Sequence, residues 1–162
     1  MDAAISIRRA RASDYSQLIA LFDDLDRLHV EAAPWLLQRP ERDPRPPEWL
    51  EAELADSNTA IFVADVGKCI GLAVIHLRDA PAFPLFISQK RGVIDGLVVH
   101  AAWRRSGVGR RLYRACEDWA RTHDAPWVEL NVYEFNTDAT EFYDALGFST
   151  TTRKLRKPLG TS

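Results

Sequence analysis

The segment Arg104-Arg105-Ser106-Gly107-Val108-Gly109 places two glycines among basic residues where the chain is expected to turn into a helix. The first backbone N–H groups of a helix lack partners within it, and the helix dipole adds partial positive charge there. Glycines let the backbone approach an anion without a Cβ in the way. The segment therefore predicts a phosphate-binding turn, to which Arg104, Arg105 and Arg110 add full charges. A helix cap with a solvated basic face is the alternative.

Other phosphate-binding loops fit the sequence less well. There is no Gly-x-x-x-x-Gly-Lys-Ser/Thr segment, and a dinucleotide fingerprint would need three glycines and a downstream acid. A second element is needed to identify the anion.

Hydrophobic periodicity predicts the strands and helices that position this turn. Alternation of Ile5 and Ile7 with polar residues predicts a half-buried first strand, and Ser13 or Asp14 offers a helix cap after it. Strands are expected at 4–9, 59–64, 69–77, 92–99, 127–133 and 148–155. Helices are expected at 15–29, 48–55, from Gly107 onward, and at 137–146 with Gly147 as the C-cap. Proline-containing loops are expected at 30–47 and 78–91.

Length and composition indicate one ordinary domain spanning residues 1–162. The formal net charge of -2 gives no general attraction to nucleic acid. No apolar run is long enough for a membrane span, and the first residues do not resemble a signal peptide, so we expect a cytoplasmic protein with no membrane partner. Cys69 and Cys116 have no metal-ligand spacing; we expect two buried core residues and no metal site.

Two longer segments carry a family resemblance. VVHAAWRRSGVGRRL (98–112) and ELNVYEFNTDATEFYDALGF (129–148) resemble the two signature segments of GNAT acetyltransferases. The resemblance implies an α/β (α+β) GNAT fold, with a central mixed, mostly antiparallel twisted sheet of six to seven strands and about four flanking helices. The implied order is β-α-α-β-β-β-α-β-α-β. Ala101, where proline is common, and Arg105, where glycine is common, depart from the family pattern.

The same resemblance implies where acetyl-coenzyme A, the co-substrate, would bind. The family's Arg/Gln-x-x-Gly-x-Gly/Ala loop holds the pyrophosphate, and the preceding strand pairs with the pantetheine arm like an added strand. Asn136 is implied to contact the cofactor arm, and Tyr143 to protonate the departing thiolate. The implied cofactor-binding residues are Val98, Val99, Arg104, Arg105, Ser106, Gly107, Val108, Gly109, Arg110, Asn136 and Tyr143.

The expected reaction needs a group that accepts a proton from the amine. An alkyl ammonium has a pKa of about 10.4 in water and attacks a thioester only as the free base. Asp95, just ahead of the cofactor-pairing stretch, is preferred as general base, with Glu134 as the alternative; either acid could instead be structural. A backbone N–H at Leu97 or Val98 would stabilise the oxyanion.

Acceptor selectivity is expected to come from the loops 29–47 and 78–90. His29, Glu31, Trp35 and Phe86 are candidates for lining the acceptor pocket, although loop packing would explain each one singly. Glu31 with Asp23 and Asp24 could attract a cationic amine.

Three functions remain open at this stage. The first is an N-acetyltransferase acting on a primary amine of a small molecule by direct attack in a ternary complex. The alternatives are acetylation of a protein N-terminus or lysine, and a non-catalytic acyl-coenzyme A-binding module. A homodimer is also expected, with the strand 149–155 pairing across it.

Overall fold

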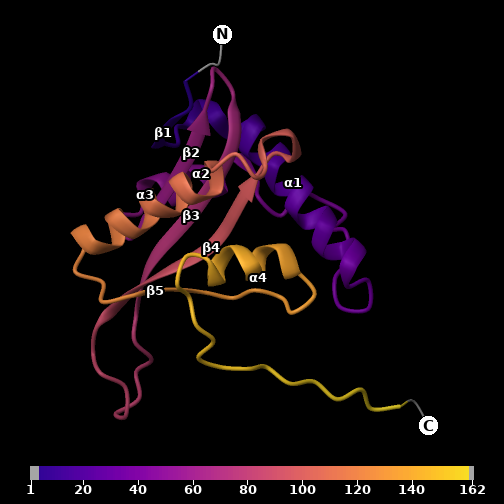
Figure 1. The fold of residues 1–162 in the computed structure, drawn as a ribbon, viewed down its shortest axis with the longest axis vertical. Coiled ribbons are helices and arrows are strands. Elements are labelled where there is room, and N and C mark those ends of the chain that lie inside the picture. Colours follow the sequence, from indigo (N-terminus) through magenta and orange to yellow (C-terminus); the bar gives the residue numbers. More distant parts are fainter. Residues whose placement is uncertain (1–3, 161–162) are drawn as a thin grey trace. The chain divides into compact units, whose positions relative to one another are not determined.

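The computed structural model describes residues 4–160, and the chain forms two compact units, one ending at Asn131 and one beginning at Val132. The first unit contains strands β1 (Ser6–Arg9), β2 (Thr59–Asp65), β3 (Cys69–Asp79), β4 (Lys90–Val99) and β5 (Val128–Leu130). Its helices are α1 (Tyr15–Ala32), α2 (Pro47–Ala55) and α3 (Val108–Thr122), with short 3₁₀ turns at Ala12–Asp14 and Ala101–Trp103. The second unit contains α4 (Thr137–Asp144). Figure 1 labels the strands and the α-helices.

The five strands of the first unit form one mixed sheet in the order β1-β2-β3-β4-β5. Neighbouring strands are antiparallel except for β4 and β5, which are parallel. The α/β class and the mostly antiparallel mixed sheet are confirmed. The expected six to seven strands are wrong for residues 4–160, which form five.

The missing strand is the one expected at 148–155. Residues 149–155 have no strand, and every one of their side chains is exposed. The segment is mostly Ser, Thr, Arg and Lys, so it offers no row of apolar side chains to bury against a sheet.

The β3–β4 hairpin is longer than expected, because pairing continues through Arg78↔Arg91 and Asp79↔Lys90. The loop therefore covers only 80–89, and its tip exposes Leu85 and Ile87. Strand β5 is shorter than the expected 127–133. It pairs with β4 over three residues, and the Gly92 N–H donates to the Trp127 carbonyl at 3.1 Å just before it.

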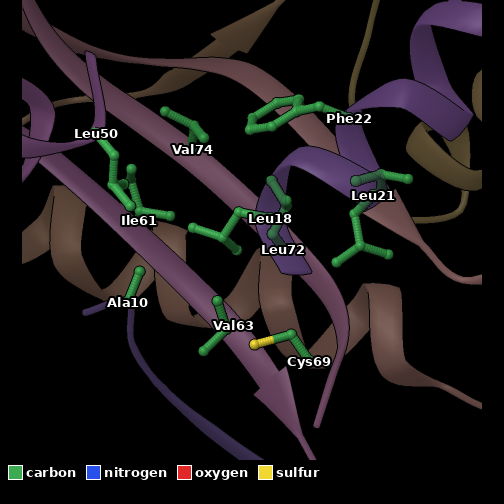
Figure 2. Packing of buried hydrophobic residues seen from close by; sticks show 11 residues of the cluster. Ala10, Leu18, Leu21, Phe22, Leu50, Ile61, Val63, Cys69, Leu72 and Val74 are labelled. Carbon is green, nitrogen blue, oxygen red and sulfur yellow. The ribbon is translucent and has the colours of Figure 1, made fainter. Parts of the chain in front are cut away.

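Two helical layers cover the sheet of the first unit. Helices α1 and α2 contribute Leu18, Phe22 and Leu50 to a buried cluster with Ile61 and Val74 of the sheet (Figure 2). Helix α3 covers the opposite face, and a Cβ added to Gly71 of β3 would lie 3.1 Å from Leu112 of α3 and 3.0 Å from the Val98 carbonyl. This close approach explains a glycine within a central strand.

One local expectation is confirmed, and two are corrected. Cys69 and Cys116 are buried and free. Helix α4 ends at Asp144 with Ala145 as its C-cap and not Gly147; Gly147, with φ +90°, belongs to the turn that follows, in which the Phe148 N–H donates to the Tyr143 carbonyl at 3.1 Å. Asp14 does not cap α1 with its side chain. It accepts instead from the Arg11 N–H at 2.8 Å, inside the preceding 3₁₀ turn.

Within residues 4–160, no helix is both long and apolar enough to cross a membrane.

Candidate active site

The predicted phosphate turn lies between β4 and α3, with its glycine at the N-cap of the helix. Helix α3 begins at Val108, and its first helical hydrogen bond runs from the Arg111 N–H to the Gly107 carbonyl at 3.1 Å. The N–H groups of Val108, Gly109 and Arg110 therefore have no helical acceptor and point out of the N-terminal end. This end of α3 can accept an anion.

Two residues of the turn adopt left-handed backbone conformations. Gly107 has φ +84°, and a Cβ built on it would meet no heavy atom within 4 Å. Glycine is therefore favoured here by the backbone conformation and not by lack of space. Arg105 has φ +62°, which explains why glycine is common there in the family that the sequence resembles. Left-handed residues among right-handed ones turn successive N–H groups toward one concavity, as anion-binding nests do.

Side chains within the turn fix its shape. The Arg104 Nε atom donates to the Val99 carbonyl at 3.1 Å, which ties the turn to the last residue of β4. The Ser106 hydroxyl donates to the Trp103 carbonyl at 2.5 Å. Arg104, Arg105 and Arg110 are exposed, and they place three positive side chains at the turn.

The C-terminal half of β4 has an open edge. Strand β5 pairs with β4 only at Gly92, Val93 and Ile94, and no strand in residues 4–160 pairs with β4 beyond Ile94 on that side. The His100 N–H donates toward β3, to the Ile70 carbonyl at 2.9 Å. Because backbone groups alternate along a strand, those of Leu97 and Val99 face the open edge, whereas those of Val98 face β3. An extended ligand could pair there as an added strand.

The open edge begins at a β-bulge that contains Asp95. Val74 of β3 pairs with Gly96, but the next residue, Ile75, pairs with Ile94, so Asp95 is the extra residue. Bulges bend a strand and re-aim a side chain. This bulge coincides with the end of the β4–β5 pairing and explains how the two strands part.

Asp95 is held by two basic side chains of β3. Its Oδ2 atom accepts from His76 Nε2 at 3.0 Å and from Arg78 Nη2 at 3.0 Å. Its Oδ1 atom has no hydrogen-bond partner in the described part of the chain, and the side chain is 44% exposed. The hydrogen bond from His76 lowers the pKa of Asp95, and the one from Arg78 lowers it further. Asp95 is therefore a carboxylate at neutral pH, with one oxygen available to a ligand or water.

A more buried polar group stands behind His76. The Nδ1 atom of His76 lies 2.9 Å from the Thr59 hydroxyl and 3.7 Å from Glu53 Oε2. The Glu53 Oε2 atom is itself buried and has no hydrogen-bond partner among the residues that the structure describes. The Thr59 hydroxyl in turn donates to Asp56 Oδ2 at 3.2 Å.

A cavity of about 230 Å³ lies between α1 and the segment that leads into the phosphate turn. It is lined by Asp24, Arg27, Leu28, Glu31, Ala101 and Arg104. Asp24 is paired with Arg27 at 2.7 Å, while Glu31 has no ion-pair partner among the described residues. Two of the acids considered for a cationic amine, Asp24 and Glu31, thus line a cavity.

The other acceptor-pocket candidates lie elsewhere. Asp23 faces Arg39 at 3.8 Å. His29, Trp35 and Phe86 do not line the cavity; Trp35 is 71% and Phe86 54% exposed, and burial lowers the pKa of His29.

The second unit carries the remaining predicted site residues on or beside α4. Asn136 is the N-cap of α4, and its Oδ1 atom accepts from the Ala139 N–H at 3.2 Å. Tyr143 is half-buried and packs edge-on against Phe142 and Phe148, with ring centroids 5.2 and 5.4 Å apart. Glu134, the alternative base, is exposed.

His76 and Arg78, which hold Asp95, and Glu53, which lies behind His76, were not predicted from the sequence. A signal was available for His76, because it occupies an inward position in the alternation of β3, where Leu72 and Val74 are buried. A titratable residue in such a row needs a polar partner.

Comparison with known proteins gives a family match over most of the chain. Residues 22–148 match the sequence profile described as the Acetyltransferase (GNAT) family. An aminoglycoside N(6')-acetyltransferase type 1 from Stenotrophomonas maltophilia is 31% identical over 141 residues, covering 82% of this chain and 91% of that protein. A protein of the same description from Klebsiella aerogenes is 30% identical, covering 69% of this chain and 74% of that protein.

Solved structures share the fold. A mutant of the BH1408 protein from Bacillus halodurans superposes with a TM-score of 0.88 at 27% identity, covering 95% of this chain and 99% of that one. An aminoglycoside antibiotic 6'-N-acetyltransferase from Acinetobacter baumannii superposes with a TM-score of 0.72 at 18% identity, covering 98% of this chain and 100% of that one.

Proposed function

The chain belongs to the GNAT family of acetyltransferases and is an acetyl-transferring enzyme, and we propose that it transfers the acetyl group of acetyl-coenzyme A to a primary amine of a small molecule. The relatives described as aminoglycoside N(6')-acetyltransferases support this acceptor class. In the structure, the observation that carries the proposal is the open edge of β4 leading directly to the N-terminal end of α3.

In the proposed complex, the pyrophosphate binds at the turn and the pantetheine arm pairs with β4. The N–H groups at Val108, Gly109 and Arg110 and the charges of Arg104, Arg105 and Arg110 hold the phosphates. The backbone of Val99 pairs with the amide groups of the arm. Val98, whose backbone faces β3, contributes only by holding its neighbours in place. Ser106 fixes the shape of the turn.

The amine attacks the thioester carbonyl directly, within a complex of enzyme, acetyl-coenzyme A and acceptor. Its nitrogen becomes positively charged on attack and must then lose a proton. A carboxylate with a lowered pKa does not readily deprotonate a free alkyl ammonium. Asp95 instead accepts, through water, the proton of the tetrahedral intermediate and stabilises its positive nitrogen. The Leu97 N–H, on the open edge, is the donor proposed for the oxyanion.

The departing thiolate of coenzyme A needs a proton, and Tyr143 is the proposed donor. Asn136 is proposed to contact the cofactor arm. Its Oδ1 atom already caps α4, so the amide Nδ2 group is the part proposed for the cofactor. Both assignments rest on the match of residues 22–148 to the family.

The acceptor class is tested by mass spectrometry of the products formed from acetyl-coenzyme A with aminoglycosides, polyamines, amino acids and peptides with free N-termini or lysines. We expect an acetylated small amine to form fastest. Faster acetylation of a peptide would replace this proposal with protein acetylation.

A homodimer and a cytoplasmic location are further parts of the proposal. The segment expected to pair across the dimer, 149–155, forms no strand in the structure, so the dimer would need another contact. Sedimentation equilibrium of the full chain measures its mass in solution.

A further inference from the structure

In the described part of the chain, only one of the two carboxylate oxygens of Asp95 is held by hydrogen bonds. Among residues 4–160, two hydrogen bonds go to Oδ2, each at 3.0 Å, and none goes to Oδ1. Two donors on one oxygen fix the rotamer of a carboxylate and leave its second oxygen directed away from them. A base or charge-stabilising group must be held in position to be effective.

The two donors differ in their surroundings. Arg78 is 53% exposed, so solvent weakens its contribution, whereas the His76 side chain is only 14% exposed. Buried hydrogen bonds to an ionised group are the stronger ones. His76 is therefore the principal support of Asp95.

The ring of His76 is in turn fixed from behind. Thr59 donates its hydroxyl hydrogen to Asp56 Oδ2, so a lone pair of its oxygen faces His76 Nδ1 at 2.9 Å. Glu53 Oε2, which is buried and has no hydrogen-bond partner within 4–160, lies 3.7 Å from the same nitrogen. Both ring nitrogens therefore face oxygen atoms, and these contacts hold the ring with Nε2 toward Asp95.

We propose that His76 is a positioning residue, which holds Asp95 by Oδ2 so that Oδ1 is presented to the acceptor amine, and that Glu53 holds the His76 ring in this orientation. The proposal rests on the role of Asp95 in the proposed function. Neither His76 nor Glu53 touches the substrates. The charged and titratable groups that face this pair are Asp95 and Arg78 from the β3–β4 side and Asp56 from the loop after α2.

The test compares His76→Ala, His76→Gln and Glu53→Gln with the unchanged enzyme. His76→Ala removes the donor to Oδ2, and we expect kcat to fall between about tenfold and a hundredfold through misplacement of Asp95, with KM for acetyl-coenzyme A unchanged. Glutamine carries an amide donor of similar reach, so His76→Gln is expected to recover most of kcat. Glu53→Gln is expected to cause a smaller loss. The control is Arg91→Gln, since Arg91 bonds to Glu129 and to the Asp79 carbonyl and not to Asp95.

A titration separates positioning from packing. The hydrogen bond from His76 lowers the pKa of Asp95, so its removal must raise that pKa. In His76→Ala, we expect the acid limb of the kcat/KM profile and the carbon-13 carboxyl resonance of Asp95 to titrate at higher pH. The Arg91→Gln control should leave both unmoved.

The proposal is overturned if His76→Ala keeps its kcat, or if the Asp95 resonance titrates as in the unchanged enzyme. If His76→Ala does not fold, His76→Gln decides: a large loss of kcat with an unmoved Asp95 titration also overturns it. The resonance is measured on the resting enzyme. An enzyme that acetylates no amine would thus refute the proposed function, while the titration still decides the role of His76.

Discussion

The Oδ2 atom of Asp95 lies 3.0 Å from the Nε2 atom of His76, at the bulge where β5 stops pairing with β4. Asp95 thus lies at the start of the open edge and is the only acidic residue of β4. The contact favours the ionised form of Asp95 and fixes the direction of its other oxygen, Oδ1. This suits the proposed role, in which Asp95 receives a proton from the nitrogen of the newly formed C–N bond.

Asp95→Asn keeps the size of the side chain and removes its charge. General acid–base groups contribute about a hundredfold to ten-thousandfold, so we expect kcat to fall by at least the lower figure, with KM for acetyl-coenzyme A little changed. Steady-state kinetics check this. Asp118→Asn, on the exposed face of α3, is the control. An Asp95→Asn enzyme with full kcat would leave Glu134 as the acid to examine.

Gly107→Ala tests the backbone of the phosphate turn. Its φ of +84° is unfavourable for alanine although the added Cβ meets nothing, so we expect a loss of about 1 kcal/mol in stability or a relaxed turn. In either case the turn is less well ordered, so we expect the Kd for coenzyme A, measured by calorimetry, to rise. Gly67→Ala is a matched control, because Gly67 has φ +91° and equally open surroundings in the β2–β3 turn. It should lose similar stability and bind coenzyme A normally; equal binding losses in both variants would contradict the turn's role.

Glu31→Gln tests the cavity beside α1. Glu31 has no ion-pair partner in the described part of the chain, so its charge is available to a cationic acceptor. An exposed ion pair is worth up to about 1 kcal/mol, or about fivefold, and we expect KM for a polyamine or aminoglycoside to rise by up to that factor. KM for acetyl-coenzyme A should not change. Asp23→Asn, which removes the acid facing Arg39, should leave acceptor KM unchanged; an equal rise in both variants would indicate only long-range charge.

Tyr143→Phe removes the proposed proton donor while keeping the ring that packs against Phe142 and Phe148. We expect kcat to fall at least tenfold and the Kd for coenzyme A to stay the same, since the hydroxyl acts on the leaving group. Tyr133→Phe is the control in the same unit. Unchanged turnover in Tyr143→Phe would show that Tyr143 is not the proton donor and contributes only by packing.

Asp14→Asn tests a structural ion pair away from the site. Asp14 is buried and accepts two hydrogen bonds from Arg8, at 2.8 and 2.9 Å, and these bonds are the main reason that its pKa is lowered. Breaking a buried pair costs about 3–5 kcal/mol, so the variant should be less stable at pH 7. A lowered pKa gives stability that is present above the unfolded-state pKa and lost as pH falls through the folded-state pKa.

The difference in stability between the unchanged protein and Asp14→Asn should therefore shrink as the solution is acidified below pH about 4. Urea unfolding at several pH values measures it. A difference that stays constant with pH would show that the charge of Asp14 contributes nothing.

The sequence predicted most of the first unit, because its signals are local. The apolar period of α1, the Pro47 start of α2 and the glycine turn before α3 all appear where expected. The extent of pairing was less predictable. Strand β3 continues to Asp79 because Arg91 and Lys90 of β4 continue the pairing. No residue type in either segment indicates where this pairing ends.

The sequence signals that His76 needs a polar partner, but it does not identify Asp95 as that partner, for a related reason. His76, Glu53 and Asp95 come from three elements, and their contacts depend on a one-residue bulge that shifts the register of β4. The sequence marks this bulge only by Gly96, the glycine that follows Asp95 within the strand. The strand expected at 148–155 was wrong because its threonines favour a strand, but apolar residues stand only at its two ends, Phe148 and Leu155.

Release of free thiol from acetyl-coenzyme A in the presence and absence of amine tests the central claim most directly. We predict release that depends on the amine, saturates with both substrates, and is lost in Asp95→Asn. Thiol release at the same slow rate with every small amine and every peptide, together with no detectable binding of coenzyme A, would contradict it.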